Sequence, residues 1–380
     1  MLIEHFWQDE DKRYWVDCRV NSLYRFLSFY GIEIPRSYIF LLSEAYSFYY
    51  LYIDFENSKV PRIPFVATSE SCLEKTLFKA LNIQSMTERL DNSEAAFEKL
   101  KDFMRVQKPI LMHAIEYVFI GRTEVLDRLK VNIRMQSIPI LIGIDEDENY
   151  VLYWFSSGQN DSQNPITVRK RKDVDYLRSI ECAPYPPDYQ CTYISGFVSP
   201  ISKEFIIQRL NEAIKHITQK MLNGFQIDPV AICNLAATES STGLNAMGKM
   251  NSDLQKMLSV MRRHPEDGEH KKRCYLALLL FRVFLFKASI SSLRQEFGSA
   301  LCQLSDDIHD TTLSGIGHEF IGVSRGWKRL FVMLGRLKSG NFCVEQIAEI
   351  CDIFNIIYEQ ERIGFNKLAK YYDIKEEPLC

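Results

Sequence analysis

The period of the hydrophobic pattern changes near residue 200, and this change constrains the fold more than any other feature of the chain. Between residues 108 and 198 the apolar residues form short runs rich in Ile, Val, Leu and Tyr, a composition typical of β-strands. From residue 202 onward they recur every three or four positions, which is the spacing of one face of an α-helix. We therefore expect an α+β domain over residues 1–199 and an all-helical domain over residues 200–380.

Individual elements follow from the same patterns together with capping and turn residues. In the first domain we expect a helix that starts at Cys18 and ends at Gly31, and a β-hairpin whose polar turn is IDEDEN. Further helices are expected over 36–53, 70–83 and 92–107, and strands over 108–120, 137–155 and 164–171. In the second domain the predicted helices cover about 202–222, 237–262, 269–304, 316–337 and 343–371.

Charge, hydropathy and cysteine spacing exclude several classes of protein. The net charge of −3, from 46 basic and 49 acidic residues, gives no electrostatic case for nucleic acid or a membrane surface. The longest apolar stretch, residues 274–288, is too short to span a bilayer and contains Arg282. None of the ten cysteines forms a Cys-x-x-Cys pair, and the acidic turn 145–149 lacks the spacing of a calcium loop, so we expect no metal. The N-terminus has no signal-peptide pattern, and we expect a cytoplasmic protein with reduced thiols.

Cys18 is the first candidate for chemistry. The sequence YWVDCRVNSLYRFLSFYGIEI places it directly before an amphipathic run that ends at Gly31. A thiol at a helix N-terminus lies beside unpaired N–H groups and the positive end of the helix dipole, which favour the nucleophilic thiolate. Arg19 adds a nearby positive charge, and the N–H groups of the same helix start can stabilise an oxyanion. The alternative is a small apolar residue that begins a core helix, because free cysteine is among the most buried residue types.

Several segments follow one another in the order of a known family. They are the helix-capping Cys18, the helix that ends in YGIEI, the segments PRSYIFLLSEAYSFYYLY, KPILMHAIEYVFI and SIPILIGIDEDENYV, and a helical C-terminal half. Over roughly residues 14–155 this pattern resembles the butirosin biosynthesis protein H family. The resemblance implies a papain-like N-terminal domain. It also implies an acyltransferase of antibiotic or other specialised-metabolite biosynthesis, which moves an acyl group from a carrier-protein thioester to an amine.

The chain departs from the pattern of that family at its catalytic positions. The family histidine, just before the strand IPILIGID, falls here on Gln136 or Ser137. The acidic residue expected after the hairpin falls near Tyr153 and Trp154, and LLSEAYSFYY stands where the family has a glycine-rich segment. The nucleophile is therefore retained, whereas the usual base is missing.

His113 is the remaining candidate base, since the first domain contains only one other histidine, His5, which precedes any regular element. On a regular strand its side chain shares a face with Ile115, near the position where the resemblance implies an aspartate. Glu116 and Asp145 are the candidates to orient its imidazole. The alternative is a core histidine that donates a hydrogen bond to a backbone carbonyl.

A basic run, VRKRKDV, contains Arg169, Lys170, Arg171 and Lys172. Carrier proteins are typically acidic on their recognition helix, so these side chains are candidates for carrier docking. The alternative is a solvated strand edge whose charges discourage edge-to-edge pairing.

The resemblance implies a cysteine-dependent acyl- or aminoacyltransferase whose partners are an acyl or peptidyl carrier protein and a small-molecule amine. We expect no cofactor of its own, because the phosphopantetheine arm belongs to the carrier. A thioester substrate has an easily expelled thiolate, so the missing base matters mainly for deprotonating the amine. Two other classes stay open: a cysteine hydrolase or cyclase, and a non-catalytic binding or scaffold protein, which the missing histidine favours. A homodimer also stays open.

Overall fold

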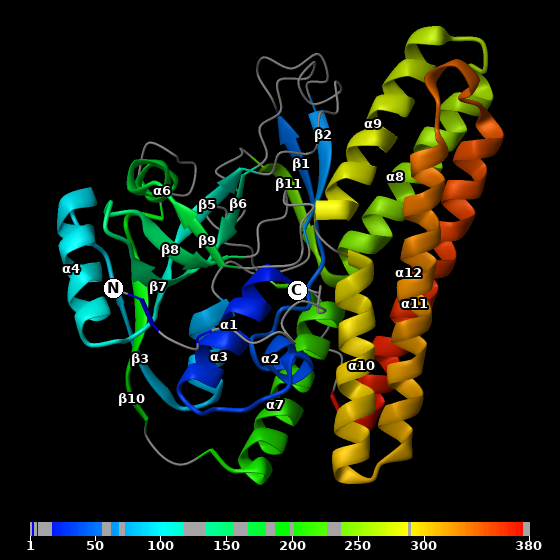
Figure 1. Ribbon diagram of the computed structural model, residues 1–380. Coiled ribbons are helices and arrows are strands. Elements are labelled where there is room, and N and C mark those ends of the chain that lie inside the picture. Colours follow the sequence, from blue (N-terminus) through cyan, green and yellow to red (C-terminus); the bar gives the residue numbers. More distant parts are fainter. Residues whose placement is uncertain are drawn as a thin grey trace.

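The computed structural model describes residues 2–3, 6, 17–54, 62–67, 73–117, 134–154, 166–179, 187–197, 201–225, 237–287 and 290–374. Figure 1 shows a mixed α and β structure, in which an antiparallel sheet flanked by helices is joined to a group of long helices. The strand-rich part precedes the helix-rich part along the chain, as the change in hydrophobic period predicts.

The first half is built around a six-stranded sheet with the strand order β3-β10-β4-β7-β8-β9. Every neighbouring pair of strands is antiparallel. The hairpin predicted around IDEDEN is present as β7 and β8. The strands are β3 (Ile83–Glu88), β4 (Ile110–Met112), β7 (Ile140–Ile144), β8 (Tyr150–Tyr153), β9 (Ile166–Arg169) and β10 (Cys191–Phe197).

Helices cover both faces of this sheet because alternate strand residues point to opposite sides. On one face the ring of Tyr150 packs on Phe97 of α4, with centroids 5.8 Å apart. On the other face Tyr153 packs on Phe6, which in turn contacts Phe29 of α1. Figure 1 shows α4 outside the sheet and α1 and α3 on its inner side. The helices of this half are α1 (Cys18–Phe29), α2 (Arg36–Leu42), α3 (Leu73–Ala80), α4 (Ser93–Arg105) and α6 (Arg171–Arg178).

Two stretches predicted as helix form strands instead. Residues 49–54 form β1 (Tyr49–Asp54), and residues 237–242 form β11 (Ala237–Thr242), in a three-stranded sheet of order β11-β1-β2 with β2 (Arg62–Ala67). The sequences YYLYID and ATESST are rich in aromatic, Ser and Thr residues, which have low helix propensity and accept strand pairing readily. A smaller sheet pairs β5 (Ala114–Tyr117) with β6 (Arg134–Ser137).

The second half contains long helices that pack on one another and on α2. The stretch 269–304, predicted as one helix, contains the end of one helix at Lys287 and the start of the next at Ile290. No helix of the described residues is long and apolar enough to cross a membrane. The helices are α7 (Lys203–Asn223), α8 (Gly243–Arg263), α9 (Gly268–Lys287), α10 (Ile290–Ile308), α11 (Thr311–Arg336) and α12 (Val344–Tyr371).

A fully buried ion pair links these helices to the segment after α2. Arg294 of α10 donates to Glu361 of α12, with 2.9 Å between Nε and Oε1, and neither side chain is exposed. Trp327 Nε1 also donates to Glu361 at 2.9 Å, and the Tyr46 hydroxyl donates at 3.1 Å. The guanidinium lies 4.4 Å from the Tyr46 ring centroid and reaches the carbonyl of Ser47. The helical half therefore holds residues of the first half through one buried carboxylate.

Candidate functional site

Cys18 lies at a helix start, as the sequence predicts. Helix α1 begins at Cys18, and Asp17 is its N-cap. The Asp17 carboxylate accepts a hydrogen bond from the backbone N–H of Arg19 at 2.8 Å. The Cys18 side chain is half-buried and packs against the core of the first half. The thiol therefore lies at the positive end of α1.

The charge of Arg19 is already paired. Its guanidinium folds back onto Asp17, with 3.1 Å between Nη2 and Oδ2, and the two side chains are only 9% and 12% exposed. Burial alone would lower the pKa of Arg19, but the Asp17 carboxylate outweighs it, and Cys18 and Glu74 add to the upward shift. The backbone donor of Arg19 predicted for an oxyanion is engaged by Asp17 in this structure. An oxyanion at Cys18 would therefore have to compete with this N-cap.

His113 lies at a break in the strand rather than in the middle of it. The chain leaves the six-stranded sheet after Met112 and enters the β5–β6 pair at Ala114. The imidazole is 2% exposed, and its Nε2 lies 3.0 Å from the hydroxyl of Thr192. Burial lowers the pKa of His113, and a nearby carboxylate opposes that shift. His113 is therefore a core histidine bonded to a hydroxyl, and its imidazole favours the neutral form.

Glu74 is the carboxylate beside His113, and the sequence did not point to it. It lies in the first turn of α3 and is 1% exposed. Its Oε1 is 3.8 Å from Nε2 of His113 and makes no hydrogen bond with the part of the chain that the structure describes. The same carboxylate acts electrostatically on Arg19, next to Cys18. Glu74 is therefore a buried carboxylate next to the imidazole, and its charge also acts on Arg19. Its only signal in the sequence is an acidic residue in a first helical turn, which the helix dipole favours.

The two acids predicted to orient His113 are placed differently. The carboxylate of Asp145 caps its own turn: it accepts hydrogen bonds from the backbone of Asp147 at 3.0 Å and of Asn149 at 2.7 Å. The Asn149 side chain donates to the other oxygen, and these hydrogen bonds lower the pKa of Asp145. Both oxygens thus stabilise the hairpin turn. The Glu116 backbone belongs to β5, and its side chain lies outside the described residues, as does His5.

Ser137 and Trp154 lie together, at the positions where the resemblance places the catalytic histidine and its acidic partner. Trp154 Nε1 donates to Ser137 Oγ at 2.9 Å, and both side chains are buried. A neutral indole and a hydroxyl cannot take a proton from a thiol at neutral pH. Any base for Cys18 must therefore come from elsewhere.

The basic run is divided between the end of a strand and the start of a helix. Arg169 ends β9, Lys170 is the N-cap of α6, and Arg171 and Lys172 begin that helix, where the sequence suggested a strand edge. Arg171 contacts Glu94 at 2.6 Å. Arg171 also forms ion pairs with Asp175 and Glu148, and its guanidinium lies 3.8 Å from the centroid of the Phe97 ring.

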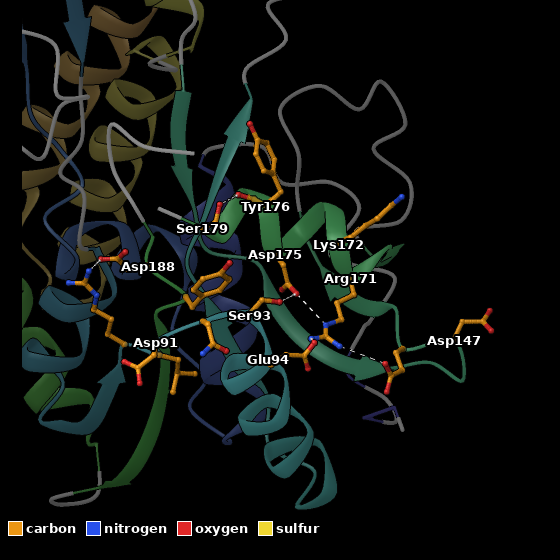
Figure 2. Close-up of a pocket in the computed structure, with 15 residues that line it drawn as sticks. Asp91, Ser93, Glu94, Asp147, Arg171, Lys172, Asp175, Tyr176, Ser179 and Asp188 are labelled. Atoms are coloured by element: carbon orange, nitrogen blue, oxygen red, sulfur yellow. Dashed lines mark hydrogen bonds and ion pairs between the residues drawn. The ribbon is translucent and has the colours of Figure 1, made fainter. Parts of the chain in front are cut away.

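Arg171 and Lys172 line a groove between the start of α4 and α6, with a volume of about 1070 Å³ (Figure 2). Its lining contains six acidic residues, Asp91, Glu94, Asp147, Glu148, Asp175 and Asp188, against three basic ones, Arg89, Arg171 and Lys172. Figure 2 shows Arg171 held between the acids, with Asp147 and Lys172 pointing outward. The groove is therefore acid-rich, which disfavours the docking of an acidic carrier protein here.

Among the described residues, no group of three or more His, Cys, Asp or Glu side chains could hold a metal ion. No protein-family model matches the chain, and no curated protein matches it significantly in sequence.

Proposed function

We propose that this chain is a cysteine-dependent acyl- or aminoacyltransferase with a papain-like N-terminal domain, and that Cys18 accepts the acyl group from a carrier-protein thioester. The observation that supports the proposal is the position of the half-buried Cys18 thiol at the start of α1. The same half of the chain also holds a buried carboxylate and imidazole, Glu74 and His113, 3.8 Å apart. Such a reaction belongs in a cytoplasm, where thiols such as Cys18 stay reduced.

In the proposed reaction, the Cys18 thiolate attacks the thioester carbonyl. A bond from the Cys18 sulfur to the acyl carbon forms, and the bond to the phosphopantetheine sulfur breaks, so the carrier leaves as a thiolate. A small-molecule amine then attacks the acyl-cysteine, and the amide forms as the Cys18 sulfur departs. The amine proton passes to a base, for which His113 is the candidate because its imidazole favours the neutral form.

Glu74 takes the role of the orienting acid that Asp145 and Glu116 were predicted to have. Its carboxylate lies 3.8 Å from the imidazole and stabilises the protonated state that forms when the base accepts a proton. The docking role predicted for Arg169, Lys170, Arg171 and Lys172 is not part of the proposal, because the groove beside them is acid-rich.

A non-catalytic binding or scaffold protein is the second candidate. The observation that favours it is the hydrogen bond from Trp154 to Ser137, which occupies the positions of the expected base and acid. A fold that keeps only the cysteine would retain its shape and lose turnover.

The test uses a synthetic acyl-phosphopantetheine thioester and intact-mass spectrometry of the full chain. We expect a single acyl adduct on Cys18, its absence in Cys18→Ser, and its release as an amide when an amine is added. Release as free acid at the same rate with and without the amine would favour the hydrolase instead. Cys302→Ser is the matched control, since Cys302 is another half-buried free cysteine, on α10, and we expect it to label like the wild type. No adduct on the wild type would contradict the proposal and favour the scaffold.

A further inference from the structure

Arg178 is a buried cation with an incomplete set of partners. It lies at the end of α6 and is 0% exposed. Its Nη2 donates to the carbonyls of Tyr189 at 3.1 Å and Gln190 at 3.4 Å. Its Nε and Nη1 are buried without a hydrogen-bond partner in the described segments. The guanidinium carbon lies 5.7 Å from the centroid of the Tyr189 ring. Because burying an unpaired charge costs several kcal/mol, this arrangement calls for a reason beyond packing.

The carbonyls that Arg178 holds belong to a strained turn. Asp188 and Tyr189 both have φ of 50°, in the left-handed region that residues other than glycine rarely adopt. Such residues persist where neighbouring contacts fix them. Here the backbone N–H of Tyr189 donates to the Arg178 carbonyl at 3.0 Å, so Arg178 binds the turn through its backbone as well as its side chain. The turn also lines the acid-rich groove.

The same turn holds the backbone of His113. The His113 N–H donates to the carbonyl of Gln190 at 3.1 Å, and that carbonyl also accepts the hydrogen bond from Arg178. Two residues further along, Thr192 contacts the His113 imidazole. A shift of the turn would therefore move the backbone anchor and the side-chain partner of His113 together.

The charge of Arg178 also acts on the imidazole. Among the described residues, the Glu74 carboxylate and the cations Lys75 and Arg178 act electrostatically on His113. Burial lowers the pKa of His113, Glu74 opposes the shift, and Lys75 and Arg178 add to it. Burial is the largest cause of this shift, and Arg178 is a minor one.

We propose that Arg178 is a positioning residue for His113: its guanidinium fixes the turn that anchors the His113 backbone and carries its side-chain partner Thr192. The significance of this arrangement for catalysis rests on the proposed function, whereas the effect on His113 itself does not.

The test compares Arg178→Met, which removes the charge but keeps most of the stem, with Arg178→Lys, which keeps the charge but loses the planar fork. NMR titration of the full chain with labelled histidine gives the protonation midpoint of His113, assigned by comparison with His113→Asn. Hydrogen exchange of the peptide that contains His113 measures how firmly its N–H is held. Arg169→Met is the matched control, because Arg169 also has a buried, unpartnered Nε but does not act on His113.

We expect Arg178→Met to speed exchange of the His113 N–H by at least about tenfold, because the turn loses the hydrogen bonds that fix it. The His113 midpoint should rise slightly, because a nearby positive charge is removed. Arg178→Lys should keep the midpoint and speed exchange of the His113 N–H by about tenfold, and Arg169→Met should change neither. Unchanged exchange of the His113 N–H in Arg178→Met, or an equal acceleration in Arg169→Met, would overturn the proposal. Should Arg178→Met fail to fold, unchanged exchange in Arg178→Lys would overturn it. The titration does not need Cys18, so a chain without transferase activity can still show the effect.

Discussion

Replacing Glu361 by alanine should destabilise the protein severely, because one carboxylate satisfies three buried donors. The substitution leaves Arg294 as a buried charge without its partner, and it removes the acceptor of the Trp327 indole and the Tyr46 hydroxyl. Breaking a buried ion pair from one side costs about 3–5 kcal/mol. Each orphaned donor adds about 1–3 kcal/mol, although such terms are not additive. We therefore expect a loss of at least about 4 kcal/mol in the free energy of unfolding.

Equilibrium denaturation in urea, followed by circular dichroism, measures this loss. Glu319→Ala is the matched control, since Glu319 pairs with Lys367 at the surface and should cost no more than about 1 kcal/mol. The double variant Arg294→Met/Glu361→Leu removes both buried charges, so it should be more stable than Glu361→Ala. A loss below about 1 kcal/mol for Glu361→Ala, or a double variant less stable than it, would refute the account of this network.

Three further outcomes follow from the packing and the charges. Gly298→Ala places a Cβ 2.5 Å from the carbonyl oxygen of Gly317, and thermal melts should show a loss of about 1–3 kcal/mol in stability. Gly322→Ala is the control: its Cβ has no heavy atom within 4 Å, so this substitution should be neutral or stabilising. Burial alone would raise the pKa of Glu44, but the hydrogen bonds that it accepts from α7 lower this pKa. The contribution of Glu44 to the stability of the fold is therefore present above the pKa of the unfolded state, and it is lost as the pH falls through the pKa of the folded state. Glu44→Gln should therefore flatten the fall in stability below about pH 4.5; an unchanged slope would contradict this. Arg171→Met should loosen α4 from α6 and lower the melting temperature by a few degrees, which corresponds to roughly 1 kcal/mol of unfolding free energy. Lys172→Met is the control and should leave the melting temperature unchanged; equal effects of the two variants would count against the role of the ion pairs of Arg171.

Local signals in the sequence predicted local structure well. The capping residue Asn92 precedes α4, Gly31 follows α1 with φ of 74°, and the IDEDEN turn joins two strands. Pairing between distant segments was not predictable in the same way. The stretch 49–54 continues a helical pattern in the sequence, yet it forms the strand β1 between β2 and β11. Because β11 comes from a distant part of the chain, and a strand pair depends on both segments, the pattern of one segment does not predict this sheet.

In the candidate site, too, local features follow from the sequence, whereas contacts between distant segments do not. Cys18 at a helix start follows from capping and periodicity and is confirmed. The proximity of Glu74 to His113 depends on how α3 packs against the sheet, which no spacing in the sequence encodes. For the basic run, the sequence shows the positive charges of Arg171 and its neighbours, but not the acids from other elements that pair with Arg171.

The reactivity of Cys18 tests the central claim most directly. Alkylation of the full chain with iodoacetamide, followed by peptide mass spectrometry across a range of pH, gives the rate at each cysteine. The account predicts that Cys18 reacts at pH 7 at least about tenfold faster than Cys302, whose pKa is raised by burial. Equal rates at the two cysteines, or no reaction at Cys18, would contradict the claim that this thiol is a nucleophile.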